Sequence, residues 1–331
     1  MTSLGPAARR IARLTGLPVR DARAAGAQHG YQHFMVTLAG GQRAFAKVAA
    51  EDGPAIDGTT PDGAALDGTA LDDAALDDAA PDGTGSGHVG GAFAAEANGL
   101  RWLAEADAVP VPEVLAVTGA ALVISMIPPG RASPSAAFVF GAGLARLHAA
   151  GAADFGAPWR GVIASLPLDN TPLDDKPRAG PPDWPSWYAA RRVLPYLRMA
   201  VDTGALGRPD AKLVEAVTDR IGTLAGPAEP PSRIHGDCWA GNVLWSGDQG
   251  WLIDPAAHGG HRETDLAMLA LFGAPDLDRI VAGYNDTAPL AAGWRDRIPL
   301  HQLHPLLVHA CLFGASYAEG VRAAARAALS A

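Results

Sequence analysis

The folding pattern of this 331-residue chain is clearest in residues 233–271, which read RIHGDCWAGNVLWSGDQGWLIDPAAHGGHRETDLAMLAL. Two short apolar segments within it, 242–245 and 251–253, flank a Gly-Asp-Gln-Gly turn. Apolar runs on either side of such a turn predict a β-hairpin. Because a hairpin brings its two ends together, the polar residues at those ends are expected to lie close to one another.

Three polar side chains mark the ends of this predicted hairpin: Asp237 precedes it, Asn242 opens it and Asp254 closes it. Asp237 could accept the proton of an attacking hydroxyl group, whereas Asn242 and Asp254 offer the hard oxygen ligands that Mg²⁺ prefers. With His235, the spacing H-x-D-x-x-x-x-N followed by a later Asp is that of a kinase catalytic loop. The segment therefore predicts phosphoryl transfer from ATP, with Asp237 as the base and Mg²⁺ held by Asn242 and Asp254. The alternative is a polar turn whose aspartate caps a neighbouring segment.

A lysine on a predicted strand supplies a second kinase feature. Residues 31–38 and 43–48 are joined by a Gly-Gly turn, and Lys47 lies among apolar residues of the second segment. A lysine in such a place costs stability unless it is paired, and the V-A-I-K lysine of kinases occupies this strand. Glu96 lies in the first half of a helix predicted over 92–106 and is expected to pair with Lys47. The alternative is a solvated helix glutamate.

Two further segments are expected to contact the nucleotide. Gly30 lies in a loop before the first of those strands, where its backbone N–H could approach phosphates, although an ordinary hairpin turn is an equal alternative. The apolar segment 121–127 predicts a buried strand that ends at an inter-lobe hinge. The backbone groups of Ser125, Met126 and Ile127 are predicted to hold the edge of the adenine.

An acidic stretch interrupts the N-terminal part of the chain. Residues 51–90 contain Glu51 and nine aspartates but no Lys or Arg, in five-residue units such as LDDAA. Their charge, Gly and Pro predict a disordered insertion. The formal charge is −9 for the chain and −10 for this stretch, which leaves +1 for the remainder. A remainder without a basic face argues against a nucleic-acid partner.

The expected organisation is two lobes. Residues 1–127 would form the ATP-binding N-lobe with its acidic insertion, and residues 128–331 the C-lobe with the catalytic loop and the acceptor site. The two cysteines suit a reducing compartment, and the N-terminus lacks the apolar core of a signal peptide. Because no apolar run reaches transmembrane length either, the expected location is the cytoplasm, without membrane contact.

Longer motifs are similar to one particular family. HGDCWAGN at 235–242, IDPAAHGGHRETDLAMLALFG at 253–273 and DWPSWYAARRVLPYL at 183–197 resemble the fructosamine-3-kinase (ketosamine-3-kinase) family. That family shares the protein-kinase-like fold with aminoglycoside phosphotransferases. The resemblance implies an α+β, bilobal architecture, with a small β-rich N-lobe and a larger, mainly helical C-lobe. It also implies ATP-dependent phosphorylation of the sugar 3-hydroxyl of ketosamines, the ribulosamine and fructosamine adducts of amines and protein lysines, as deglycation repair.

The resemblance also assigns roles to individual residues. Lys47 would hold the ATP phosphates and Glu96 would orient it, while Trp239 would form an aromatic wall against the sugar-amine, with core packing as its alternative. His261 is expected to contact the substrate, with a structural role in capping the following helix left open. Asp265 is expected to tie the catalytic loop to that helix. One departure from the family is Ser125, at a hinge position where Glu is common.

Two other functions remain open. An aminoglycoside or other small-alcohol phosphotransferase would share the fold, but such pockets usually display clustered acids, whereas His258, His261 and Arg262 follow Asp254 here. A nucleotide-binding pseudokinase is the non-enzymatic alternative. The intact kinase set of Lys, two Asp and Asn argues against it.

Overall fold

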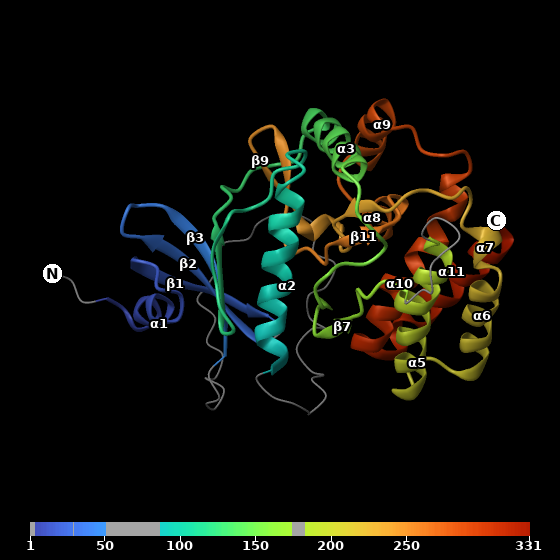
Figure 1. The fold of residues 1–331 in the computed structure, drawn as a ribbon, viewed down its shortest axis with the longest axis horizontal. Helices are drawn as coiled ribbons and strands as arrows, with labels where there is room; N and C mark the ends of the chain where they lie inside the picture. The colour runs from blue at the N-terminus through green and yellow to red at the C-terminus, as the bar shows by residue number, and fades with distance from the viewer. Residues whose placement is uncertain (1–3, 29, 51–86, 174–182) are drawn as a thin grey trace.

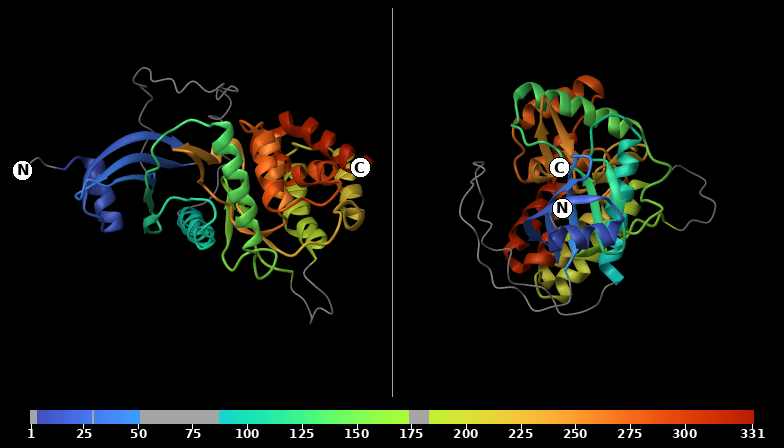
Figure 2. Two further views of the ribbon diagram at one scale, coloured as in Figure 1. Left: turned by 90° about the horizontal axis from the view of Figure 1, so that it is seen from above. Right: turned by 90° about the vertical axis from the view of Figure 1, so that its left-hand side faces the viewer.

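The computed structural model describes residues 4–28, 30–50, 87–173 and 183–331. The molecule is elongated, with a β-sheet at one end and a group of helices at the other (Figures 1 and 2). Helix α2, Gly87–Ala104, lies between them and contacts strands of the sheet. The architecture is therefore α+β, as the sequence predicts.

The N-terminal sheet has five antiparallel strands in the order β1-β2-β3-β5-β4. Their bounds are β1 Val19–Gln28, β2 Tyr31–Leu38, β3 Arg43–Ala49, β4 Val114–Val117 and β5 Ala121–Ser125. Alternate residues of β2, including Phe34 and Val36, are buried and belong to one cluster with Ile11 of helix α1, Pro6–Thr15. Strand β1 was not predicted, because most of its side chains are exposed and it carries no apolar alternation.

Helix α2 packs its apolar face against the sheet. Phe93, Ala97 and Leu100 recur at helical spacing and form a cluster with Leu122 and Ile124 of β5. The helix begins at residue 87. Residues 87–90, which were predicted to be part of the acidic insertion, therefore belong to the helix. The remainder of that predicted insertion, 51–86, lies outside the described residues.

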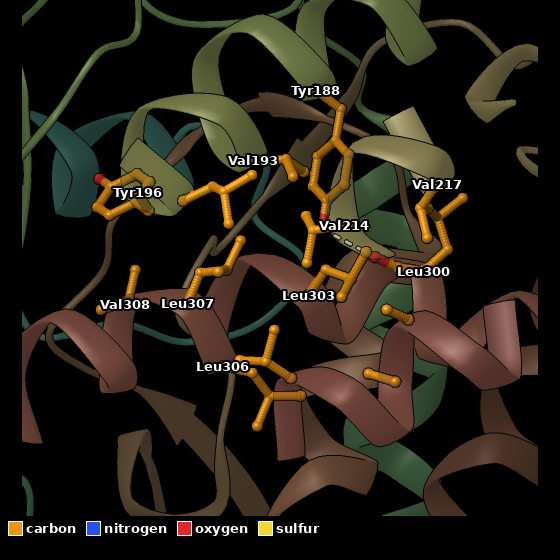
Figure 3. Packing of buried hydrophobic residues seen from close by; sticks show 14 of the residues in the cluster. Tyr188, Val193, Tyr196, Val214, Val217, Leu300, Leu303, Leu306, Leu307 and Val308 are labelled. Carbon is orange, nitrogen blue, oxygen red and sulfur yellow. Dashed lines mark hydrogen bonds between the residues drawn. The ribbon is translucent and has the colours of Figure 1, made fainter. Parts of the chain in front are cut away.

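The C-terminal part is mainly helical. Its α-helices are α3 Pro134–Ala149, α4 Trp184–Tyr188, α5 Leu194–Asp202, α6 Arg208–Asp219, α7 Ile221–Leu224, α8 Glu263–Leu271, α9 Leu277–Thr287, α10 Trp294–Phe313 and α11 Ala318–Ser330. A π-helical turn, Ala189–Val193, joins α4 to α5. Side chains from α5, α6 and α10 fill the core between these helices (Figure 3). The hydroxyl group of buried Tyr188 donates to the carbonyl of Leu300 at 3.0 Å, which ties α4 to α10.

Three small two-stranded antiparallel sheets complete the described C-terminal part, and two of them are hairpins. They pair β6 Gly161–Ile163 with β7 Leu166–Leu168, β8 Ser232–Ile234 with β11 His258–Gly260, and β9 Val243–Ser246 with β10 Gln249–Leu252. The third is the hairpin predicted from the sequence. Strands β6 and β7 and the start of α4 lie in the segment between α3 and α5. Among the described residues, no helix is long and apolar enough to cross a bilayer.

Candidate active site

The β9–β10 hairpin brings the predicted base and its neighbours together. The Asn242 side-chain Nδ2 donates to the Asp237 carboxylate and to the Asp237 carbonyl, both at 2.9 Å. At the other end of the hairpin, the N–H of Ile253 donates to the Asn242 carbonyl at 3.1 Å. Because Asp254 is the residue after Ile253, this bond keeps the backbone of Asp254 close to that of Asn242. Among the described residues, no hydrogen bond involves Oδ1 of Asn242, so this oxygen can bind another partner.

A buried aspartate, Asp265 of α8, anchors the backbone of the catalytic loop by hydrogen bonds. The backbone N–H groups of His235 and Gly236 donate to the two carboxylate oxygens of Asp265, at 2.7 and 3.0 Å. His148 of α3 lies 3.1 Å from the same carboxylate through Nε2, and its Nδ1 lies 2.8 Å from the Tyr284 hydroxyl. Burial acts to raise the pKa of Asp265, but hydrogen bonds with His148 and the charge of that ring outweigh it and lower the pKa. The structural role predicted for Asp265 is confirmed.

Lys47 joins the sheet to the catalytic segment. Its Nζ lies 2.9 Å from Glu96 of α2 and 2.8 Å from Asp254. Burial acts to lower the pKa of Lys47, but the charges of Glu96 and Asp254 raise it overall, so the ammonium group stays protonated. Burial and the second carboxylate, Asp254, raise the pKa of Glu96 to about 7 despite the lysine. The expected Lys47–Glu96 pair is thus present, and it extends to Asp254.

The two aspartates of the site differ in environment. Burial, followed by the negative charges of Asp254 and Asp265, raises the pKa of Asp237 to about 7 although the Asn242 hydrogen bond lowers it. Asp254 has a backbone φ of +52°, a left-handed conformation that is uncommon for residues other than glycine and is often found at functional sites. Its side chain is 42% exposed, so a ligand from solvent can reach the carboxylate.

The remaining predicted nucleotide contacts lie on the sheet. Gly30 is exposed in the β1–β2 turn with a φ of +77°, and a Cβ there would meet no atom within 4 Å. At the end of β5, the N–H of Ser125 donates to the Glu113 carbonyl, and that of Met126 donates to the Arg43 carbonyl. Within the described part of the chain, the Ile127 amide is the one of these three with no hydrogen-bond partner.

Trp239 is a surface residue of the catalytic loop. Its side chain is 39% exposed, and its ring packs edge-on against Phe272 at a centroid distance of 6.1 Å. A Cβ on Gly241 would lie 2.3 Å from the indole, so a glycine is needed for the ring to lie along the loop. This position contradicts the core-packing alternative. The sequence did not predict that Phe272 contacts Trp239, nor that His309 of α10 packs against Phe272, because both contacts depend on tertiary packing.

His261 does not fit the predicted substrate role. It is 3% exposed and packs between the rings of Trp184 and His301. Its Nδ1 accepts the backbone N–H of Glu263 at the start of α8, which is the capping alternative left open by the sequence. Burial and the neighbouring His301 keep its pKa well below the usual value, so the ring is neutral.

Like His261, the two other residues after Asp254 that were expected to disfavour an aminoglycoside substrate, His258 and Arg262, have structural partners. His258 is buried, with its Nδ1 2.8 Å from the Ala256 carbonyl. Arg262 forms a two-bond ion pair with Glu229, at 2.7 and 2.8 Å. None of these groups, His261 included, is free to line an acceptor pocket.

Two groups of side chains could be considered for a metal ion. Asp254 and Asn242 Oδ1 present hard oxygen donors close to Asp237, and this donor set fits Mg²⁺. The buried trio His261, Glu263 and His301 also lies within ligand spacing. There, however, both Glu263 oxygens are hydrogen bonded to Arg297, at 2.6 and 2.9 Å, and the arginine already supplies the positive charge.

Comparison with known proteins gives a consistent result. A family model described as fructosamine kinase matches residues 86–331. The Escherichia coli K12 protein YniA, named as a probable ketoamine kinase, is 35% identical over 231 residues, which cover 68% of this chain and 76% of YniA. The crystal structure of a Thermobifida fusca protein assigned as a fructosamine-3-kinase is 47% identical, covers 98% of this chain and 99% of that one, and has a TM-score of 0.82.

More distant structures are similar in fold alone. The ADP-bound aminoglycoside phosphotransferase APH(2″)-Ib is 12% identical over 96% of this chain and 97% of its own, with a TM-score of 0.57. The fold is therefore protein-kinase-like, with a small β-rich lobe and a larger helical lobe. The division at residue 127 remains a prediction.

Proposed function

Because the chain belongs to the fructosamine kinase family, we propose that it transfers the γ-phosphoryl group of ATP to the 3-hydroxyl of the sugar in ketosamines. The observation that supports this best is the position of Asp254: Lys47 lies 2.8 Å from its carboxylate, and the preceding residue, Ile253, is bonded to Asn242, whose side chain is bonded to the base Asp237. Phosphoryl transfer needs positioned positive charge and a group that accepts the proton of the attacking hydroxyl, and Lys47 and Asp237 supply these two.

Each side chain has one task in this proposal. Lys47, held by Glu96, neutralises charge on the ATP phosphates. Asp254 and Asn242 hold Mg²⁺, which when bound offsets the charge that develops on the phosphate oxygens. Asp237 accepts a hydrogen bond from the attacking hydroxyl and takes its proton as the new P–O bond forms. A base of this kind contributes roughly 10²–10⁴ in rate, and positioning and charge supply the rest.

The nucleotide is held by the sheet. Gly30 in the β1–β2 turn offers its backbone N–H to the phosphates. The N–H of Ile127, which has no partner among the described residues, lies next to Ser125 and Met126 and offers a donor to the adenine edge.

The acceptor binds at Trp239. Its exposed indole lies two residues beyond the base and offers an apolar and cation-attracting face to the protonated amine of a ketosamine. An open wall of this kind suits an adduct on a protein lysine as well as on a small amine, because the amine substituent can extend into solvent. Glycated protein is therefore included in the proposed substrate class.

The test is ³¹P NMR of the protein with ATP, MgCl₂ and synthetic ribulosamine or fructosamine. We expect a new sugar phosphate resonance and stoichiometric ADP. Parallel reactions with kanamycin and gentamicin separate the aminoglycoside alternative, which distant fold similarity alone does not favour. A sugar phosphate absent from both ketosamine reactions would overturn the proposal. ADP formed only with the antibiotics would replace it with the drug-modifying activity.

A further inference from the structure

A small, partly open cavity lies next to the catalytic loop, and none of the residues proposed above to hold the nucleotide or the acceptor lines it. About 10 Å³ of it is available to the centre of a water-sized guest. Its lining includes Arg192, Tyr188, His258, His261, His304 and the backbone of Gly236, which directly precedes the proposed base. The cavity therefore has room for one monatomic or water-sized occupant and excludes phosphate or a carboxylate.

Arg192 is an unusual residue to find in such a wall. It lies on the π-helical turn Ala189–Val193 and is 1% exposed. One terminal nitrogen donates to the Asp169 carbonyl and the other to Asn170 Oδ1, both at 2.6 Å, and the guanidinium stacks on Trp187. These are neutral partners.

The guanidinium of Arg192 has no directly bonded carboxylate among the described residues, and the charge of Asp169 acts on it only from a distance. The carboxylate of Asp169 pairs instead with Arg191 at 3.0 Å. Across the described segments, no carboxylate forms an ion pair with Arg192, and its Nε–H has no acceptor. Burying an unpaired charge costs several kcal/mol or more, so proteins usually place an opposite charge beside it.

His304 of α10 supplies a second unsatisfied group on the same cavity. It is 5% exposed, and its Nε2 has no hydrogen-bond partner in the described part of the chain. Burial and the nearby charge of Arg192 keep the pKa of His304 well below its usual value, so the ring is neutral and can carry its proton on Nε2. Asp265, the buried acid behind the loop, is already bonded to His148 and to two backbone N–H groups.

We infer that this cavity binds one monovalent anion of the chloride class, held by the Nε–H of Arg192 and the Nε2–H of His304. Water could satisfy the two donors, but it would leave the buried guanidinium without a negative charge in direct contact. A bound halide accepts hydrogen bonds from both donors and also places a negative charge beside the guanidinium. It also fills the space against Gly236, so it stabilises the wall that supports the catalytic loop. The inference does not depend on the identity of the phosphoryl acceptor.

Crystals grown in sodium bromide test the inference directly. We expect an anomalous difference peak in the cavity, within hydrogen-bonding distance of Arg192 Nε and His304 Nε2. Density that refines as water, with no anomalous signal at saturating bromide, would overturn it. This measurement uses the unaltered protein and therefore does not depend on how well a variant folds.

Thermal unfolding gives the matching solution test. At constant ionic strength, replacing sodium gluconate by sodium chloride should raise the Tm of the wild type saturably, by about 3–6 °C. His304→Phe keeps the ring but removes the donor, and it should lose most of this halide response. His309→Phe is the matched control on the same helix, outside the cavity lining, and should keep it. An equal halide response in the wild type and His304→Phe would contradict the site.

Discussion

The surroundings of Asp237 shift its pKa in opposite directions. Burial and two neighbouring carboxylates raise its pKa to about 7, whereas the Asn242 hydrogen bond favours the ionised form. A base whose pKa lies near the working pH is well matched to accepting a proton in the transition state. The arrangement that suits catalysis therefore also makes the ionised side chain costly to the folded state.

The pH dependence of activity should reflect this. Because the ionised form of Asp237 is the competent one, kcat/KM should rise as the pH increases through about 7 and level off above it. Glu96 also has a pKa of about 7, so the profile is best compared with that of Glu96→Gln. An acid limb that persists in the variant assigns the titration to Asp237. A limb that disappears assigns it to Glu96 and contradicts our interpretation.

The same pKa predicts a stability gain from a loss-of-function substitution. The pKa of the carboxylate is 3.8 in the unfolded chain and about 7 in the folded protein, so the carboxylate destabilises the fold increasingly between about pH 4 and pH 7 and fully above that. At pH 8, Asp237→Asn should increase the free energy of unfolding by about 1–2 kcal/mol, after allowing for the partial exposure of the site. The gain should fall as the pH drops and vanish near pH 4. Urea unfolding at several pH values measures it, and a gain independent of pH would exclude this cause.

At the level of elements, the catalytic loop is built from backbone as much as from side chains. Gly236 has a φ of +81°, and a Cβ there would lie 2.3 Å from the Ala256 carbonyl oxygen. Its N–H is one of the two that bond to Asp265. A glycine is thus required by conformation and by space at the residue before the base.

Two alanine substitutions separate these requirements. Gly247, in the β9–β10 turn, also has a positive φ of +59°, but a Cβ there would meet nothing within 4 Å. Gly247→Ala should cost about 1 kcal/mol of stability from backbone strain alone and leave kcat nearly unchanged. Gly236→Ala should cost about 3 kcal/mol or more and lower kcat by at least tenfold. Equal effects of the two variants, measured by unfolding and steady-state kinetics, would show that the close approach is unimportant.

The elements that the sequence predicts well are those with local signals. The β9–β10 hairpin, the pairing of Glu96 with Lys47 and the anchoring role of Asp265 all followed from spacing, apolar pattern and family resemblance. Strand β1 could not be predicted because its side chains are mostly exposed, and it is defined by its pairing with β2. The orientation of His261 was missed because ring packing against Trp184 and His301, far away in sequence, decides it.

For the whole molecule, the decisive contact is the one that Lys47 makes across its two parts. The lysine lies on the sheet, Glu96 on α2 and Asp254 after β10, so one ammonium group links three elements that are distant in sequence. ATP phosphates would compete with Asp254 for this ammonium group, and Mg²⁺ would compensate the freed carboxylate. Binding of nucleotide and metal should therefore be coupled.

That coupling predicts a specific pattern of thermal shifts. ATP with MgCl₂ should raise the Tm of the wild type by several degrees, and ATP with EDTA should raise it less. Asp254→Asn should bind ATP but lose the additional shift due to Mg²⁺, because it removes the charged ligand. Lys47→Met should lose most of the ATP shift in either condition. A full Mg²⁺ effect in Asp254→Asn would show that the ion binds elsewhere.

The central claim is that Asp237 is the base of a phosphoryl-transfer site that Lys47, Asn242 and Asp254 complete. Its most direct test is a single-turnover reaction of [γ-³²P]ATP with ribulosamine, in the wild type and in Asp237→Asn, with ATP affinity measured separately. We predict ATP affinity within about twofold of wild type and a transfer rate lower by about 10²–10⁴. Transfer at the wild-type rate in Asp237→Asn would contradict the account.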